Sequence, residues 1–188
     1  MIPNDILHRP RLLAGVLAAA CVAALGTGLF VQHVLGYAPC SLCVLQRLGF
    51  VGVLGAAALL LALPGAYLLS VALAGTVAAI ALGGVAVASY QVWLQAFPPL
   101  IAACGRGIAG YFDGWPFEAA LGWLFESEGD CAKPVSPLGI VSLAQLGLAA
   151  FLLMSTAALR LLWLTARGGA RPLADARPPR SSAVTSSR

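Results

Sequence analysis

The sequence has 188 residues, of which 60% are apolar and only 10% are charged, and its mean hydropathy is +0.91. An average soluble domain carries about 25% charged residues, and a globule of this length cannot bury so much apolar surface. The composition argues against a soluble enzyme, a soluble nucleic-acid-binding protein and a disordered chain. The formal net charge is +4, and the positions of the charged residues along the chain decide what it says about a partner.

Long stretches of the chain contain no Asp, Glu, Lys or Arg: residues 12–46, 48–105 and 134–159. About 20 apolar residues span a bilayer core as a helix, and lipid requires helices because it cannot hydrogen-bond an open backbone. Turn residues divide the stretches, at Pro64-Gly65 and at Pro98-Pro99. The sequence therefore predicts an all-α membrane protein with a four-transmembrane-helix bundle, the helices lying at about 12–31, 44–63, 66–94 and 138–163.

The charges indicate which side of the membrane each segment faces. The N-terminal tail carries +1 and the chain from Arg160 onward carries +5, whereas the loop at about 95–137 carries −3. Positive residues gather on the cytoplasmic side of multi-pass proteins. We therefore expect cytoplasmic tails at about 1–11 and 166–188, and periplasmic loops at about 32–43 and 95–137. The basic C-terminal tail is expected to be disordered and to face membrane lipid, and no nucleic acid is expected as a partner.

All but one of the cysteines fall in the two outward loops or where a loop meets a helix: Cys40, Cys43, Cys104 and Cys131. Disulfides persist on the oxidising side of a bacterial membrane and not in the cytosol. Four cysteines allow three pairings, and the spacings favour Cys40 with Cys43 and Cys104 with Cys131. The remaining Cys21 lies within the first helix, where a thiol is a small packing residue. A cleaved signal ending at this cysteine is the alternative, which the apolar stretch that follows disfavours.

Cys40-Ser41-Leu42-Cys43 is a Cys-x-x-Cys motif at the expected start of the second helix. A helix N-terminus favours thiolates, and Arg47 follows Cys43 by one helical turn, on the same face. An arginine near the hydrocarbon is costly and indicates a functional site, although anchoring at the interface is an alternative. The motif favours a redox-active pair over a structural disulfide or a metal site. A zinc site would need two further ligands, and His33 is the only outward histidine.

The loop between Cys104 and Cys131 contains many aromatic residues. Its run from Pro116 to Phe125 predicts a short interfacial helix, with Trp and Phe at headgroup level. Such a helix would hold the second cysteine pair near the first. A helix that merely packs over the bundle is the alternative.

The run from Pro39 to Arg47, Pro-Cys-Ser-Leu-Cys-Val-Leu-Gln-Arg, resembles the signature of the DsbB family of membrane disulfide bond formation proteins. The resemblance covers about residues 10–165. It continues through Leu94-Gln95 and Pro98, and then through Gly129-Asp130-Cys131-Ala132 and Leu138-Gly139.

This resemblance implies a bacterial inner-membrane enzyme with both termini in the cytoplasm. The enzyme would oxidise a periplasmic thioredoxin-fold dithiol oxidase, of the DsbA type, and reduce a quinone, either ubiquinone or menaquinone. It also implies an order of thiol–disulfide exchange: the partner thiolate attacks Cys104, the released Cys131 attacks Cys40, and Cys43 passes electrons to the quinone.

Two further residues are implied as quinone contacts. Arg47 would stabilise charge beside the quinone. Gln91 occupies a position where some relatives carry a histidine near the quinone. A glutamine donates a hydrogen bond but does not carry a proton as histidine does, and ordinary helix packing is the alternative for Gln91.

Two other functions remain open at this point. One is a thiol–quinone protein of the vitamin K epoxide reductase type, although that family places its Cys-x-x-Cys late in the bundle. The other is a non-enzymatic membrane protein with structural disulfides.

Overall fold

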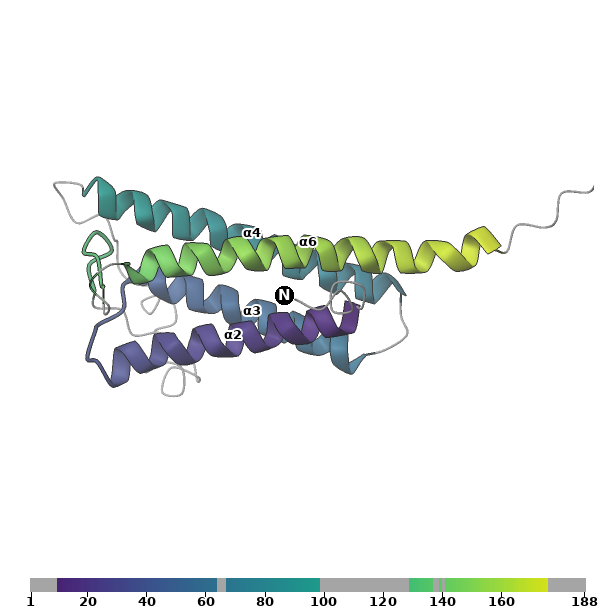
Figure 1. Ribbon diagram of the computed structural model, residues 1–188, viewed down its shortest axis with the longest axis horizontal. Coiled ribbons are helices and arrows are strands. Elements are labelled where there is room, and N and C mark those ends of the chain that lie inside the picture. The colour runs from purple at the N-terminus through teal and green to yellow at the C-terminus, as the bar shows by residue number, and fades with distance from the viewer. Residues whose placement is uncertain (1–9, 64–66, 99–128, 137–138, 140, 176–188) are drawn as a thin grey trace, which may run out of the picture.

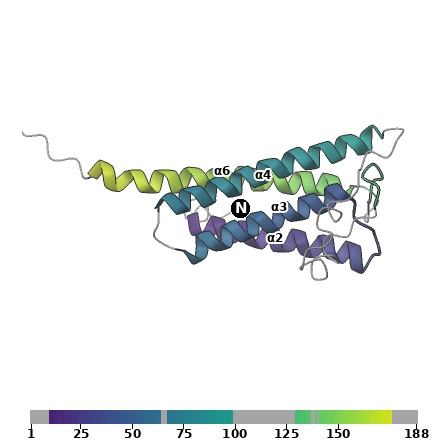
Figure 2. The same ribbon diagram turned by 180° about the vertical axis from the view of Figure 1, so that it is seen from behind.

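The computed structural model describes residues 10–63, 67–98, 129–136, 139 and 141–175. Within this part, four helices run side by side along one axis (Figures 1 and 2): α2 (Pro10–His33), α3 (Ser41–Ala62), α4 (Tyr67–Ala96) and α6 (Leu143–Asp175). Each of these helices has a segment long and apolar enough to cross a bilayer, so the expected four-helix membrane bundle is confirmed. The turn at Pro64-Gly65 and the interfacial helix expected at 116–125 lie outside the described residues.

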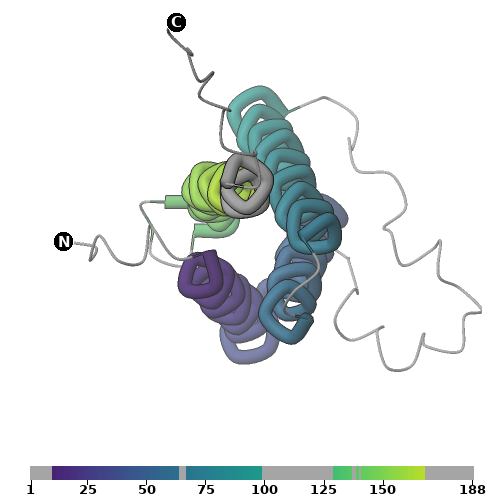
Figure 3. The backbone as a smooth tube through the Cα atoms, turned by 90° about the vertical axis from the view of Figure 1, so that its right-hand side faces the viewer, coloured from purple at the N-terminus to yellow at the C-terminus, as the bar shows by residue number. Residues whose placement is uncertain are grey.

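The helices are arranged in a ring when viewed along the bundle (Figure 3). α4 packs along both α3 and α6, and α2 packs along α3, whereas the contact between α2 and α6 is smaller. Large apolar side chains such as Leu68 and Leu153 project outward, 80% and 72% exposed. Such a surface suits lipid rather than water.

Close packing at the centre of the bundle depends on glycine. Phe50 and the fully buried Phe151 stack with their ring centroids 4.3 Å apart. A Cβ atom on Gly84 would overlap the Phe151 ring, and one on Gly49 would lie 3.2 Å from it. Membrane helices use such small residues because a glycine has no Cβ atom, which lets neighbouring elements approach closely.

Capping interactions set where α3 and α6 begin. Cys40 is the N-cap of α3, and its sulfur accepts a hydrogen bond from Cys43 N at 3.3 Å, so this helix starts at Ser41 rather than near 44. In α6, Ser142 Oγ accepts from Gln145 N at 3.3 Å while Ser142 N donates to Gln145 Oε1 at 3.0 Å. This reciprocal capping box begins the helix at 143 rather than near 138.

The far end of α6 also differs from the expectation. The helix continues to Asp175, so the C-terminal segment does not lose helical structure at 166 as expected. Alanine, leucine and arginine are strong helix formers, and Arg160 and Arg167 both stack over the Trp163 ring, with 4.4 and 3.7 Å from guanidinium carbon to ring centroid. Residues 176–188 lie outside the described residues.

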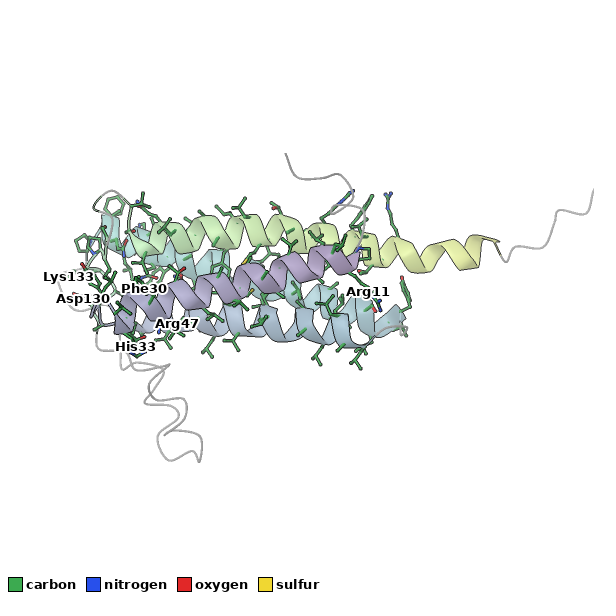
Figure 4. All side chains as sticks on the ribbon, turned by 60° about the horizontal axis from the view of Figure 1, so that its bottom comes forward. Arg11, Phe30, His33, Arg47, Asp130 and Lys133 are labelled. Atoms are coloured by element: carbon green, nitrogen blue, oxygen red, sulfur yellow. The ribbon has the colours of Figure 1, made fainter. Side chains whose placement is uncertain are left out.

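The two ends of the bundle differ in chemistry. Figure 4 shows His33, Arg47, Asp130 and Lys133 at one end and Arg11 at the other. The first end gathers the end of α2, the start of α3, the end of α4 and the start of α6, together with residues 129–136. Every cysteine of the described residues except Cys21 lies there.

Candidate functional site

The two loop segments that carry the cysteines are joined through their backbones. Gly129 N donates to Pro39 O at 3.0 Å, and Gly129 forms an isolated parallel bridge with Cys40. A Cβ atom on Gly129 would lie 2.5 Å from Ala38 O. Only glycine therefore allows this approach, which brings Cys131 to the Cys-x-x-Cys motif.

Three of the four cysteines expected in the site are described, and they lie together. Cys40 and Cys43 are free thiols with their sulfur atoms 2.9 Å apart. Cys131 is disulfide-bonded, 1% exposed, and packs in one apolar cluster with Cys40 and Leu94. Cys104 lies outside the described residues. Sulfur atoms from both loops are thus gathered at one end of the bundle.

The two thiols of the Cys-x-x-Cys motif are not equivalent. The Cys40 thiol donates a hydrogen bond to the Cys43 sulfur, and this interaction together with burial raises the pKa of Cys40 above its ordinary range. Negative charge on the pair is therefore held on Cys43, on the side of the membrane interior.

Gln91 bridges the two sulfur atoms from α4. Its Nε2 donates to Cys43 Sγ at 3.1 Å and to Cys40 Sγ at 3.3 Å. Its Oε1 accepts from Gln46 Nε2 at 2.6 Å, and both glutamines are buried. This contact fixes which end of the Gln91 amide faces the sulfurs, because only its N–H end is left to do so.

Sequence reasoning did not single out Gln46. The sequence did contain a signal for this residue. Gln46 is polar although it lies in a charge-free apolar run, and it follows Cys43 by three positions, which places it on the same helix face.

Arg47 points across to α2 and is only 8% exposed. Its guanidinium donates to Gln32 Oε1 and, at 3.0 Å, to Gly28 O. A Cβ atom on Gly28 would be 3.4 Å from Arg47 Nε. A buried cation is costly unless it is hydrogen-bonded, and these partners provide the bonds. The guanidinium thus turns inward between the helices instead of extending to the interface as an anchor.

A cavity of about 240 Å³ lies beside these groups, among α2, α3, α4 and α6. Its polar wall comes from Cys43, Gln46, Arg47 and Gln91, with Thr27 opposite on α2. Phe50 and small residues of α2 and α6 supply the apolar wall. The cavity combines a redox-active sulfur, hydrogen-bond donors and an apolar lining, which is the usual make-up of a small-molecule site.

Comparison with known proteins identifies the family. The family model for disulfide bond formation protein DsbB matches residues 10–161. The chain belongs to the DsbB family. Relatives named disulfide bond formation protein B include those of Verminephrobacter eiseniae, 37% identical over 94% of this chain and 98% of the relative, and of an Acidovorax species, 36% identical over 92% and 99%. A relative from an Azoarcus species is 37% identical over 84% of this chain and 92% of its own.

Membership of the DsbB family confirms the resemblance found in the sequence. The chain is accordingly a multi-pass membrane thiol oxidoreductase of disulfide bond formation. The vitamin K epoxide reductase type and a non-enzymatic membrane protein are the alternatives that this assignment displaces.

Proposed function

We propose that this DsbB-family protein oxidises the dithiol of a thioredoxin-fold partner, of the DsbA type, and delivers the electrons to a membrane quinone. The observation that carries the proposal is the continuous series of groups at one end of the bundle. Cys131 lies against Cys40, Cys40 contacts Cys43, and Cys43 borders the 240 Å³ cavity.

The proposed route begins at the second loop. A thiolate of the reduced partner bonds to Cys104 Sγ, the Cys104–Cys131 bond breaks, and its electron pair leaves on Cys131. The Cys131 thiolate then bonds to Cys40 Sγ, the Cys40–Cys43 bond breaks, and the electron pair is left on Cys43. The second partner thiol attacks the mixed disulfide at Cys104, which leaves the partner oxidised and Cys104 as a thiolate. Cys104 then bonds to Cys131 Sγ and the Cys131–Cys40 bond breaks, which returns Cys40 as a thiolate beside Cys43. The Cys40–Cys43 disulfide would re-form as the pair gives two electrons to a bound quinone.

Cys43 is the better leaving group of its pair. The Gln91 amide donates to its sulfur at 3.1 Å, and this bond would strengthen as charge develops on Cys43, because hydrogen bonds to a charged group are stronger than those to a neutral one. In the fully reduced pair, the Cys40 thiol also donates to Cys43 and its raised pKa keeps the proton on Cys40. These contacts support Cys43 as the thiolate that faces the cavity.

The cavity supports the head group of a quinone, either ubiquinone or menaquinone, as the electron acceptor. A cavity of about 150 Å³ accommodates one benzene ring, so 240 Å³ accommodates a substituted ring. A bound quinone supplies an acceptor for two electrons and two protons. Arg47 would hold developing negative charge on its oxygen, while Gln46 and Gln91 would offer amide hydrogen bonds and Phe50 an apolar face.

We further propose that the cysteine end of the bundle faces the periplasm of a bacterial inner membrane, with both tails in the cytoplasm. Arg11 near the start of α2 lies at the opposite end of the bundle (Figure 4), and the later part of α6, which carries the arginines stacked on Trp163, runs toward that end (Figure 1). Positive residues at that end support a cytoplasmic assignment.

Purified protein, a reduced thioredoxin-fold oxidase and a soluble ubiquinone or menaquinone analogue test the proposal together. Cys43→Ser should abolish quinone-dependent oxidation of the partner, whereas Cys21→Ser, which removes a buried thiol outside the site, should not. In Cys131→Ser, the mixed disulfide with the partner should map to Cys104. Turnover that survives Cys43→Ser would refute the route, and a trapped adduct at Cys40 would refute its order.

A further inference from the structure

Ser41 belongs to the Cys-x-x-Cys motif, but its side chain contacts Cys131, the cysteine of the second loop. Ser41 Oγ is 3.5 Å from Cys131 Sγ, a contact between residues 90 positions apart in the sequence. Ser41 is the first residue of α3, and Cys131 is buried where the docked second loop meets it. Because Cys131 is disulfide-bonded and carries no proton, the Ser41 hydroxyl is the donor in this contact.

The docking of Gly129 is what produces this contact. The bridge between Gly129 and the Pro39-Cys40 backbone fixes the second loop two residues before Cys131. Between them, the Asp130 carboxylate is turned back to accept from Ala132 N at 3.0 Å. The acidic side chain is thus engaged by its own turn and is exposed, while the sulfur is buried against Ser41.

We propose that Ser41 is a catalytic residue for release of Cys131, its hydroxyl donating a hydrogen bond to the sulfur that leaves when the Cys104–Cys131 disulfide is opened. This inference rests on the proposed function for the electron route. In the step, the attacking thiolate of the partner gains a bond to Cys104 Sγ, and the electron pair of the broken bond goes to Cys131 Sγ. No proton needs to move, because the Ser41 O–H stabilises the thiolate as a hydrogen-bond donor.

The chemistry of the step favours such a donor. Thiol–disulfide exchange is faster when the leaving thiol has a lower pKa, and a buried thiolate is costly unless it is hydrogen-bonded. Cys40 packs in the same apolar cluster as Cys131, but its thiol proton is donated to Cys43, and the side chains of Asp130 and Lys133 in the same turn are exposed. Ser41 is the donor that α3 contributes.

Two measurements test the inference: the pKa of the Cys131 thiol in the protein alone, and the rate at which the protein forms a mixed disulfide with the reduced partner. In a reduced Cys104→Ser protein, the rate of alkylation of Cys131 against pH, mapped by peptide mass spectrometry, reports the pKa of that thiol. Ser41→Ala should raise this pKa by about 1, the equivalent of a tenfold loss of thiolate stabilisation. Ser41→Thr, which keeps the hydroxyl, should restore it. Thr76→Ala removes an exposed hydroxyl within α4 and should leave the pKa of Cys131 unchanged.

In otherwise unmodified protein, Ser41→Ala should slow formation of the mixed disulfide with the reduced partner roughly threefold to tenfold. Gly129→Ala should produce a similar loss, because it separates Cys131 from Ser41. Adding Ser41→Ala to Gly129→Ala should then change little, since both variants remove the same contact.

An unchanged pKa of Cys131 in Ser41→Ala would overturn the inference, as would full additivity of Ser41→Ala with Gly129→Ala. Either result leaves the proposed function intact if quinone-dependent turnover persists. Failure of the partner to react with the parent protein would instead refute the proposed function, and the alkylation profile of Cys131 would still report the Ser41 contact.

Discussion

Replacing Gln91 by leucine should lower the reduction potential of the Cys40–Cys43 pair. The Gln91 amide donates to both sulfurs, at 3.3 and 3.1 Å. These bonds are strong when the pair is reduced and Cys43 is a thiolate, and weak when the sulfurs form a disulfide, which is a poor acceptor. Losing them therefore destabilises the reduced form relative to the oxidised form.

The expected size of the effect follows from the value of a charge-assisted bond. Hydrogen bonds to charged groups contribute about 1.5–3 kcal/mol, and for a two-electron couple about 30 mV corresponds to 1.4 kcal/mol. Gln91→Leu should thus lower the potential by roughly 30–60 mV. The measurement is equilibration of a Cys104→Ser/Cys131→Ser protein with thiol redox buffers, followed by thiol trapping.

Two controls separate this effect from a general loss of packing. Gln95→Leu removes a glutamine one turn further along α4, whose Oε1 accepts from Ser142 Oγ at 3.0 Å, and should leave the potential unchanged. Gln91→Leu leaves the Gln46 amide unpaired, so adding Gln46→Leu should recover stability without restoring the potential. A potential that does not fall in Gln91→Leu, or that falls equally in Gln95→Leu, would refute the reasoning.

Three further predictions follow from the same contacts. Arg47→Met should lower quinone-dependent turnover by roughly 10- to 100-fold, since it removes a charged donor from the cavity wall. Formation of the mixed disulfide with the partner should continue in this variant. Unchanged quinone dependence would argue for a structural role of Arg47. Gly84→Val should lower the free energy of unfolding by about 1–3 kcal/mol because of overpacking, as measured by thermal denaturation in detergent, whereas Gly83→Val, with open space around it, should be nearly neutral. In the reduced protein, the raised pKa of Cys40 keeps that thiol protonated from about pH 6 to 9, so iodoacetamide should label Cys43 first; equal labelling of both would contradict the assignment.

The membrane-spanning helices could be predicted because hydrophobicity along a chain is a local property. Charge-free stretches of the required length predict spans wherever they occur, and the turn and charge signals divide them. Helix ends were less predictable. The start of α3 depends on the Cys40 cap and that of α6 on the Ser142–Gln145 capping box, and the helix of residues 166–175 exceeds what composition indicated.

The sequence by itself determined the class of the protein and the grouping of four cysteines in two loops. It also showed that Arg47 is the one charged residue between Arg11 and Arg106. These are properties of residue type and spacing, which a single chain displays directly. It pointed to Arg47 as a functional residue because a cation in an apolar run is costly anywhere in a membrane.

Only the tertiary structure decided what those residues touch. Gln91 on α4 meets the two sulfurs at the start of α3, Arg47 turns to the backbone of Gly28 on α2, and Ser41 meets Cys131. These contacts join residues 19 to 90 positions apart. They depend on the angles between helices and on one glycine docking two loops, and neither is encoded in local periodicity. Apolar spans therefore follow from the order of residues, while the polar geometry of the site follows from how the spans pack.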